Sequence, residues 1–172
     1  LPDGSVKYRT EVDGDYMVEF IERNKDNPFF LYFSPVAIHD PLEKTPKKYI
    51  DRVKTGNNKW YAGALLSLDD QIGRMMDVLK KHNLDENTII MFNSDNGTNI
   101  KAGSPEPFRG YKTQMWEEGF VRTPAIVRWP GTIPAGQTFD GISCVLDIYA
   151  TAAAIADAQL PEECDSKDLM PY

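Results

Sequence analysis

The stretch Thr88–Gly97 reads TIIMFNSDNG and places an apolar run directly before a polar turn. A short apolar run bounded by turn residues is typical of a buried β-strand. The turn carries Asp95 and Asn96, so this strand would deliver a carboxylate and an amide oxygen to its carboxyl end. Open α/β sheets bind ligands outside the carboxyl ends of their strands. The stretch therefore predicts an α/β fold with a polar site at one edge of the sheet, although Asp-Asn-Gly is also common turn chemistry without a function.

The flanking sequence alternates helical and strand-like segments. Apolar residues recur every three or four positions from Lys59 to Lys81, which predicts a long amphipathic helix. This helix would join a buried strand at Phe29–Phe33 to the strand at Thr88–Phe92, so we expect a crossover unit with parallel strands. The fold class that we predict is α/β, with a mainly parallel sheet flanked by helices. The other expected elements are helices at 15–24, 48–53 and 147–157 and a strand at 123–129.

Composition narrows the functional classes. The 172 residues carry a formal net charge of −7, which argues against nucleic-acid binding because such binding depends on a basic surface. No apolar run reaches the roughly 18 residues that cross a bilayer, so no transmembrane segment is expected. Two cysteines are too few for a disulfide scaffold and lack the spacing of a zinc site. The chain starts with Leu1 and has no signal-peptide pattern, so we expect it to begin within a longer protein.

The polar residues near the predicted sheet edge suit a metal ion and an anion. Asp95 and Asn96 offer the hard oxygen ligands that Ca²⁺ and Mg²⁺ prefer. Lys112 follows Gly110, which would let the backbone approach a ligand, and its ammonium group suits sulfate or phosphate. The alternative for Lys112 is an ordinary surface lysine. A metal ion beside an ammonium group indicates a bound oxyanion.

His39 follows the apolar segment Phe29–Phe33 and so lies at the carboxyl end of another expected strand. An imidazole at that place can donate to a substrate oxygen or protonate a leaving group near neutral pH. The alternative is a loop histidine whose ring is satisfied by a backbone carbonyl. His82, at the end of the long helix, is expected to be a solvated residue with no catalytic part.

Several other conspicuous side chains are expected to be structural. Arg109 is expected to pair with Glu106 or Glu117 on the surface rather than to bind an anion. Two adjacent methionines and three tryptophans are expected to serve packing rather than to line a cofactor site. They are Met75, Met76, Trp60, Trp116 and Trp129.

The order and spacing of these groups resemble the type I sulfatase family. The matching stretches are Pro28–Phe33 leading into His39-Asp40-Pro41, the turn Ser94–Gly97, and Gly110-Tyr111-Lys112 through Glu118-Gly119 to Arg122-Thr123-Pro124. The resemblance also extends to the long helix, to Ile126–Gly131 and to the helix near Asp147, so it covers most of the chain. Several ordered matches are more specific than any one of them.

The resemblance implies an alkaline-phosphatase-like fold and the hydrolysis of sulfate monoesters. It implies that Asp95 and Asn96 ligate Ca²⁺ and that Lys112 binds the sulfate ester. It also implies that His39 contacts the sulfate or the bridging oxygen while the alcohol departs. The alcohol portion stays open among aryl, carbohydrate and glycosaminoglycan sulfates. Most members of the family are exported or lysosomal, and we expect the same of this protein.

Two departures from the family pattern matter. The chain has Glu117–Gly119 where the family commonly has Glu-Gly-Gly, with one more residue than usual between Lys112 and Arg122. The family nucleophile is a formylglycine made from cysteine in a Cys-x-Pro-Ser-Arg motif, which neither Cys144 nor Cys164 resembles. The family's amino-terminal aspartate pair, which completes the calcium site, is expected to precede this chain.

The expected organisation is therefore an incomplete domain. We expect residues 1–160 to be the carboxyl-side part of a sulfatase catalytic domain and residues 161–172 to be a tail or a truncated linker. The isolated chain should bind calcium weakly and show no turnover. Its open sheet edges should cause self-association or pairing with the missing amino-terminal half. The alternatives are a phosphate- or phosphonate-ester hydrolase of the same superfamily and a non-catalytic module that keeps the fold.

Overall fold

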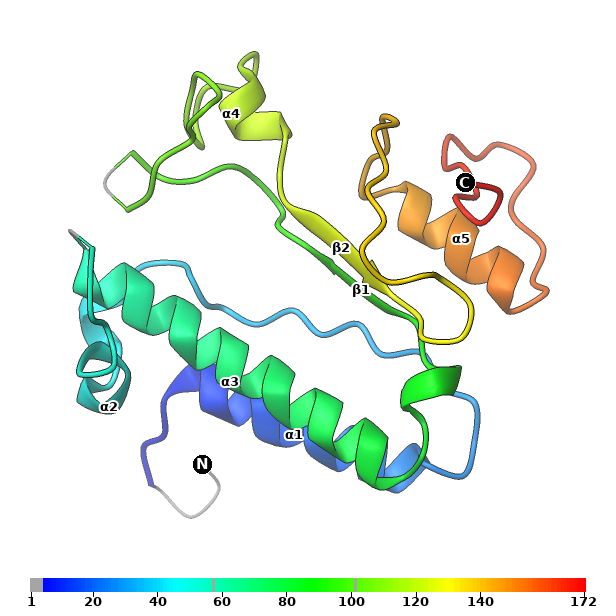
Figure 1. Ribbon diagram of the computed structural model, residues 1–172, viewed down its shortest axis with the longest axis horizontal. Helices are drawn as coiled ribbons and strands as arrows, with labels where there is room; N and C mark the ends of the chain where they lie inside the picture. Colours follow the sequence, from blue (N-terminus) through cyan, green and yellow to red (C-terminus); the bar gives the residue numbers. More distant parts are fainter. Residues whose placement is uncertain (1–4, 57, 101) are drawn as a thin grey trace. The chain divides into compact units, whose positions relative to one another are not determined.

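The computed structural model describes residues 5–56, 58–100 and 102–172, and the chain divides into two compact units (Figure 1). The first unit holds the chain up to Thr88 together with Asn99–Ser104. The second unit holds Ile89–Thr98 and Pro105–Tyr172.

The first unit is built on two helices that pack side by side, α1 at Arg9–Asn24 and α3 at Lys59–Lys81 (Figure 1). The long helix predicted from the sequence is confirmed with the same bounds. Its first turn is capped, because the Asn58 side chain accepts a hydrogen bond from the Tyr61 amide at 3.0 Å.

None of the helices formed by the described residues is long and apolar enough to cross a membrane.

Apolar side chains from both helices form the core of this unit. Met17 and Ile21 of α1 and Leu79 of α3 are almost completely buried. Burying each such side chain favours folding by about 1.5–3 kcal/mol. The remaining elements are short: the 3-10 turns η1 at Leu42–Lys44 and η2 at Asp85–Asn87, and the helix α2 at Lys47–Ile50.

The segment Phe29–Phe33, predicted as a buried strand, is extended but belongs to no sheet. Its side chains alternate in exposure, since Phe30 and Tyr32 are 71% and 82% exposed whereas the residues between and beside them are half-buried. Within the described part of the chain, its backbone groups form no hydrogen bond with other backbone groups. The prediction of a buried strand is therefore wrong here, because no described strand pairs with this segment and its second face is uncovered.

The second unit contains the sheet, which has two strands among the residues that the structure describes. β1 at Ile90–Asn93 pairs with β2 at Ala125–Arg128, and both lie in regions where strands were expected. The pairing is antiparallel, with Asn93 opposite Ala125. The prediction of a mainly parallel sheet is therefore wrong for the described residues. The crossover that it required depends on the segment Phe29–Phe33, which is unpaired.

The second unit also contains two helices, α4 at Glu118–Val121 and α5 at Asp147–Ile155. The Asp147 carboxylate accepts hydrogen bonds from the amides of Cys144 at 2.8 Å and Lys167 at 2.9 Å. The Thr151 hydroxyl accepts another from the Leu169 amide at 3.0 Å. Residues near the carboxyl end are thus attached to α5, and the predicted division after residue 160 stays a prediction.

Candidate functional site

The turn that carries Asp95 and Asn96 directly follows β1 and is fixed by hydrogen bonds. The Ser94 hydroxyl donates to the Asn96 carbonyl oxygen at 2.9 Å, and the Gly97 amide donates to the Phe120 carbonyl oxygen at 2.8 Å. Asp95 is exposed and Asn96 is half-buried. Neither side chain forms a hydrogen bond or ion pair with another residue in the described ranges. The turn therefore presents a carboxylate and an amide that are available to a ligand.

The backbone of Lys112 is attached to the same turn. Its amide donates to the carbonyl oxygen of Thr98, the residue after Gly97, at 2.9 Å. Lys112 is half-buried, and its ammonium group forms no ion pair with any residue that the structure describes. The structure therefore brings three of the four predicted site residues, Asp95, Asn96 and Lys112, together within the second unit.

Three glycines allow these loops to approach each other. A Cβ on Gly97 would lie 1.9 Å from the carbonyl oxygen of Gly119, and a Cβ on Gly119 would lie 2.3 Å from the carbonyl oxygen of Gly110. Gly110 has a φ of 97°, a value that residues with a side chain rarely adopt. Backbone atoms cannot rotate away as the end of a side chain can. Larger residues at Gly97 and Gly119 are therefore incompatible with this packing.

The same contact shows how the chain accommodates its Glu117–Gly119 sequence. Gly119 is buried, and its amide donates to the Arg109 carbonyl oxygen at 2.9 Å. Glu118, by contrast, is exposed. The position that the packing requires to be glycine is therefore glycine, and Glu118 lies on the surface.

Two contacts of arginine side chains brace the loops around Lys112. Arg109 Nη2 lies 2.7 Å from Glu117 Oε1, and its Nε lies 3.2 Å from Glu117 Oε2. This confirms that Arg109 pairs with a neighbouring glutamate, and the hydrogen bonds lower the pKa of Glu117. The Arg122 guanidinium lies over the Phe108 ring, 4.3 Å from its centroid.

His39 belongs to the first unit and is exposed. Its Nδ1 atom lies 3.0 Å from the Asp40 carbonyl oxygen, which is the contact expected of a loop histidine. When Nδ1 donates in that contact, the neutral ring has Nε2 as an acceptor and the protonated ring has Nε2 as a donor. The catalytic role predicted for His39 stays a prediction.

Three side chains differ from what the sequence led us to expect. His82 is not a solvated end residue, because its Nε2 lies 2.7 Å from Glu22 Oε2 and its side chain is 18% exposed. Trp60 and Trp116 were expected to serve packing, but they are 51% and 92% exposed. The spacing of aromatic residues alone does not show which of them the fold covers.

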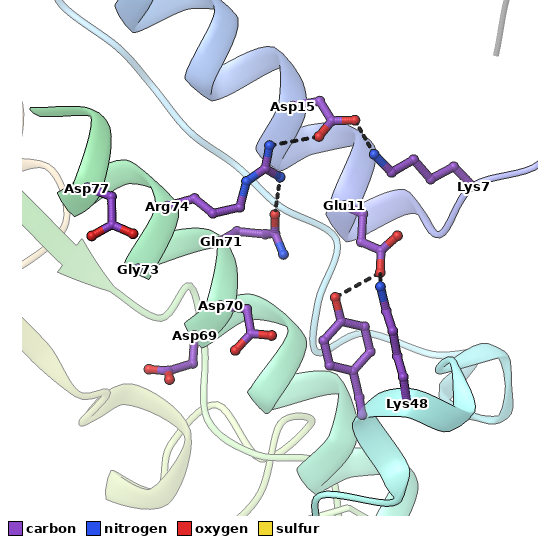
Figure 2. A pocket seen from close by; sticks show the side chains of 11 residues that line it. Lys7, Glu11, Asp15, Lys48, Asp69, Asp70, Gln71, Gly73, Arg74 and Asp77 are labelled. Carbon is purple, nitrogen blue, oxygen red and sulfur yellow. Dashed lines mark hydrogen bonds and ion pairs between the residues drawn. The ribbon is translucent and has the colours of Figure 1, made fainter. Parts of the chain in front are cut away.

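A charged pocket of about 590 Å³ in the first unit was missed by the sequence reasoning (Figure 2). Arg74 of α3 donates to Asp15 of α1 at 2.9 Å, and Lys7 also pairs with Asp15. Lys48 and Glu11 also line this pocket, and the Lys48 ammonium lies 2.6 Å from Glu11 Oε1. Glu11 and Asp15 lie one helical turn apart in α1, but Glu11 precedes the helix that was predicted at 15–24, so this spacing gave no signal.

Tyr49 closes one side of this charged pocket. Burial raises the pKa of Tyr49, and its hydroxyl donates to Glu11 Oε1 at 2.8 Å, which acts in the same direction. Burial opposes ionisation of Glu11, but hydrogen bonds from Lys48 and Tyr49 outweigh it and lower the pKa of Glu11. No cluster of three or more potential metal ligands occurs within the described ranges. Asp15 and Glu11 are paired with cations of the same pocket, so a structural role explains these two carboxylates.

A second pocket in the first unit, of about 490 Å³, is lined by one face of α1 and by the extended segment from Leu31 to Ser34. Its lining includes the apolar side chains of Phe20 and Leu31. Asp13 also lines it, with Oδ1 accepting from Arg9 Nε at 2.6 Å. The other oxygen, Oδ2, is buried and has no partner among the described residues.

Asp95 and Asn96 fit part of a calcium site. Their oxygens are hard ligands, and the exposed Asp95 carboxylate is not engaged by any described residue. Calcium takes about six to eight oxygens, more than these two side chains provide. The pair can therefore hold one side of a Ca²⁺ ion, and the remaining ligands must come from outside the pair.

Comparisons with known proteins find similarity over most of this chain. The family model described as Sulfatase matches residues 5–158. The chain is 34% identical to the steryl-sulfatase of Homo sapiens, over 89% of this chain and 27% of that protein. It is 34% identical to the N-acetylgalactosamine-6-sulfatase of Sus scrofa, over 90% of this chain and 30% of that protein. The chain thus spans less than a third of the length of these relatives.

Two solved structures have a fold similar to that of this chain. The structure of Ps i-CgsB in complex with k-i-k-neocarrahexaose matches with a TM-score of 0.89 and 32% identity, over 97% of this chain and 38% of that one. The PsFucS1 sulfatase from Pseudoalteromonas sp. matches with a TM-score of 0.82 and 33% identity, over 93% of this chain and 32% of that one.

Proposed function

Because this chain belongs to the sulfatase family, we propose that it is the carboxyl-side part of an alkaline-phosphatase-like catalytic domain that hydrolyses sulfate monoesters to an alcohol and sulfate. One observation carries the proposal. The turn with Asp95 and Asn96 and the loop with Lys112 are joined by a backbone hydrogen bond, and the side chains of these three residues are not engaged by described residues.

Each residue has a role that its chemistry supports. Asp95 and Asn96 would provide carboxylate and amide oxygens to Ca²⁺, which when bound stabilises negative charge on the sulfate oxygens. Lys112 would hold the sulfate group by its ammonium charge. Half-burial strengthens this attraction, because fewer water molecules compete with it.

His39 would act on the leaving oxygen. With Nδ1 held by the Asp40 carbonyl oxygen at 3.0 Å, a protonated ring would donate from Nε2 to the bridging oxygen of the ester. The departing alcohol would then leave as a neutral molecule. The attacking group, a formylglycine in this family, would come from the part of the protein that precedes these residues.

The same proposal assigns a partner to the extended segment Phe29–Phe33. Its backbone lacks pairing within the described ranges, and Phe30 and Tyr32 are uncovered. Extended segments with unpaired backbone groups and uncovered apolar side chains associate with other strands. The segment would therefore join a sheet with the remainder of the catalytic domain, or with a second copy when that remainder is absent.

The proposed reaction can be tested by steady-state kinetics on the full-length protein that contains this chain, called the parent protein below. We expect calcium-dependent release of 4-nitrophenol from 4-nitrophenyl sulfate, and we expect Lys112→Ala to lower kcat/KM by about 100-fold or more. Lys80→Ala, which removes an exposed lysine of α3, is the matched control and should leave the rate unchanged. Full activity of Lys112→Ala, or phosphate esters as the preferred substrates, would refute the proposal.

A further inference from the structure

The loop that carries Lys112 is closed by an ion pair between its two ends. Arg109 Nη2 lies 2.7 Å from Glu117 Oε1 and Arg109 Nε lies 3.2 Å from Glu117 Oε2, so the guanidinium holds both oxygens of the carboxylate. The Arg109 carbonyl oxygen also accepts a hydrogen bond from the Gly119 amide at 2.9 Å. Side-chain and backbone contacts therefore close the neck of the loop 109–117, and Lys112 lies inside it.

The Glu117 side chain also packs against Gly110, which lies shortly before Lys112 in the chain. A Cβ on Gly110 would lie 2.2 Å from Glu117 Cβ and 2.8 Å from Glu117 Cγ. Gly110 therefore leaves the space that the stem of the glutamate occupies. A glutamate that is held by Arg109 thus limits how the backbone before Lys112 can move.

Within the loop, Lys112 occupies a tight turn. The Gln114 amide donates to the Tyr111 carbonyl oxygen at 2.8 Å, and the Gln114 side-chain oxygen accepts from the Tyr111 amide at 2.9 Å. The first of these bonds is typical of a β-turn, with Lys112 as the first of its two central residues. This turn is local to the loop. The position of the loop as a whole therefore depends on its neck and on the hydrogen bond from the Lys112 amide to Thr98.

We propose that Arg109 and Glu117 are positioning residues, whose ion pair holds the loop 109–117 in the conformation in which Lys112 binds the sulfate ester. The inference rests on the proposed function, because it takes Lys112 as the residue that binds the sulfate group. Both partners of the pair belong to this chain, so the proposal needs no free surface. The same pair argues against Arg109 as a direct ligand of the sulfate, because Glu117 already balances its charge.

The pair is suited to place the loop rather than to stabilise the fold. The Arg109 side chain is 87% exposed, and exposed ion pairs contribute little to the free energy of unfolding. Two parallel hydrogen bonds do, however, fix the orientation of a guanidinium against a carboxylate. Reaction rates are sensitive to the placement of the groups that hold the substrate. Loss of the pair should therefore change the rate while the fold stays intact.

Kinetics of the calcium-loaded parent protein with 4-nitrophenyl sulfate can test the pair. We expect Arg109→Ala and Glu117→Gln each to lower kcat/KM by about fivefold, as the modest strength of exposed ion pairs suggests, and to leave the melting temperature unchanged. The exchange of Arg109→Glu together with Glu117→Arg should restore most of kcat/KM. Arg52→Ala is the matched control, because Arg52 holds both oxygens of Asp70 in the first unit at 2.5 and 2.9 Å. It should leave kcat/KM unchanged.

Combination with Lys112→Ala separates positioning from other roles. If the pair acts through Lys112, Arg109→Ala should have no further effect on kcat/KM in the Lys112→Ala background. The same fivefold loss in both backgrounds would overturn the proposal, because Arg109 would then bind the anion itself or support the fold in general. Glu117→Gln removes only a charge and carries the same comparison if Arg109→Ala fails to fold.

The remaining outcomes distinguish the pair from the proposed function. If Lys112→Ala lowers kcat/KM but either Arg109→Ala or Glu117→Gln is fully active, the positioning role alone is overturned. If Lys112→Ala itself is fully active, the proposed function fails, and the positioning role fails with it.

Discussion

The amide of Lys112 donates a hydrogen bond to the carbonyl oxygen of Thr98 at 2.9 Å. Through this bond the loop that carries the lysine is attached to the turn that carries Asp95 and Asn96. The backbone of Lys112 is therefore held next to this turn by a contact that does not depend on the rotamers of surface side chains. Such rigid support is what a site for a charged substrate requires.

The contact between Gly97 and Gly119 should tolerate no side chain. Gly97→Ala would place a methyl group 1.9 Å from the Gly119 carbonyl oxygen. Overpacking typically costs 1–3 kcal/mol, so we expect the free energy of unfolding to fall by about 2 kcal/mol or more in urea titrations. Gly73→Ala is the matched control, because that glycine lies in α3 with open space around its Cα. The control should be neutral or stabilising, and equal stability of the two variants would disprove the tight contact.

Tyr49 should stabilise the first unit through its hydroxyl group. The hydroxyl donates to Glu11 Oε1 at 2.8 Å, and the ring is buried. We expect Tyr49→Phe to lower the free energy of unfolding by about 1 kcal/mol, because it removes this hydrogen bond and leaves the ring packing intact. Tyr16→Phe removes an exposed hydroxyl and should have no effect in the same denaturation experiment. A Tyr49→Phe protein as stable as Tyr16→Phe would show that the hydrogen bond contributes nothing.

The attachment of the carboxyl end to α5 should depend on pH. Backbone hydrogen bonds from Cys144 and Lys167 lower the pKa of Asp147 below its ordinary value of about 3.9. A group whose pKa is lowered by folding contributes stability above its unfolded pKa and loses it as the pH falls through the folded value. We therefore expect the Lys167 amide to be protected from hydrogen exchange at pH 5 and to lose protection below about pH 4.

Asp147→Asn provides the control for that experiment. The amide of asparagine does not titrate in this range, so protection of the Lys167 amide should be low and independent of pH. If protection of the Lys167 amide has the same pH dependence in Asp147→Asn and in the unsubstituted chain, after correction for intrinsic exchange rates, then Asp147 is not the group responsible.

The uncovered face of the segment Phe29–Phe33 should make the isolated chain associate. Phe30 and Tyr32 are 71% and 82% exposed, and an exposed apolar edge promotes strand pairing. We expect light scattering to detect oligomers of the isolated chain and the double substitution Phe30→Ser and Tyr32→Ser to reduce them. Tyr16→Ser changes an exposed aromatic of α1 and should leave association as it was. A stable monomer at high concentration would count against this view.

Local structure was predicted correctly where the sequence pattern was long or where neighbouring residues alone determine the conformation. The helix at Lys59–Lys81 was predicted with its observed bounds, because 23 residues of regular apolar spacing leave little ambiguity. The turn at Asp95 was also predicted from local chemistry, and the family resemblance is confirmed.

Pairing and exposure could not be predicted in the same way. An apolar run such as Phe29–Phe33 shows the tendency to be buried in a sheet, but pairing depends on strands far away in the chain. The same limit applies to Trp116, whose exposure depends on what the rest of the fold covers. The close packing of Gly97 on Gly119 joins residues far apart in sequence, and a glycine in a loop does not reveal its partner.

The proposed site can be tested by a crystal structure of the full-length protein with calcium and inorganic sulfate. We predict one sulfate contacted by the Lys112 ammonium and by His39 Nε2, next to a calcium ion bound by Asp95 and Asn96. A structure in which His39, Asp95 and Lys112 face different cavities, or in which the sulfate and the calcium ion bind apart from them, would contradict it.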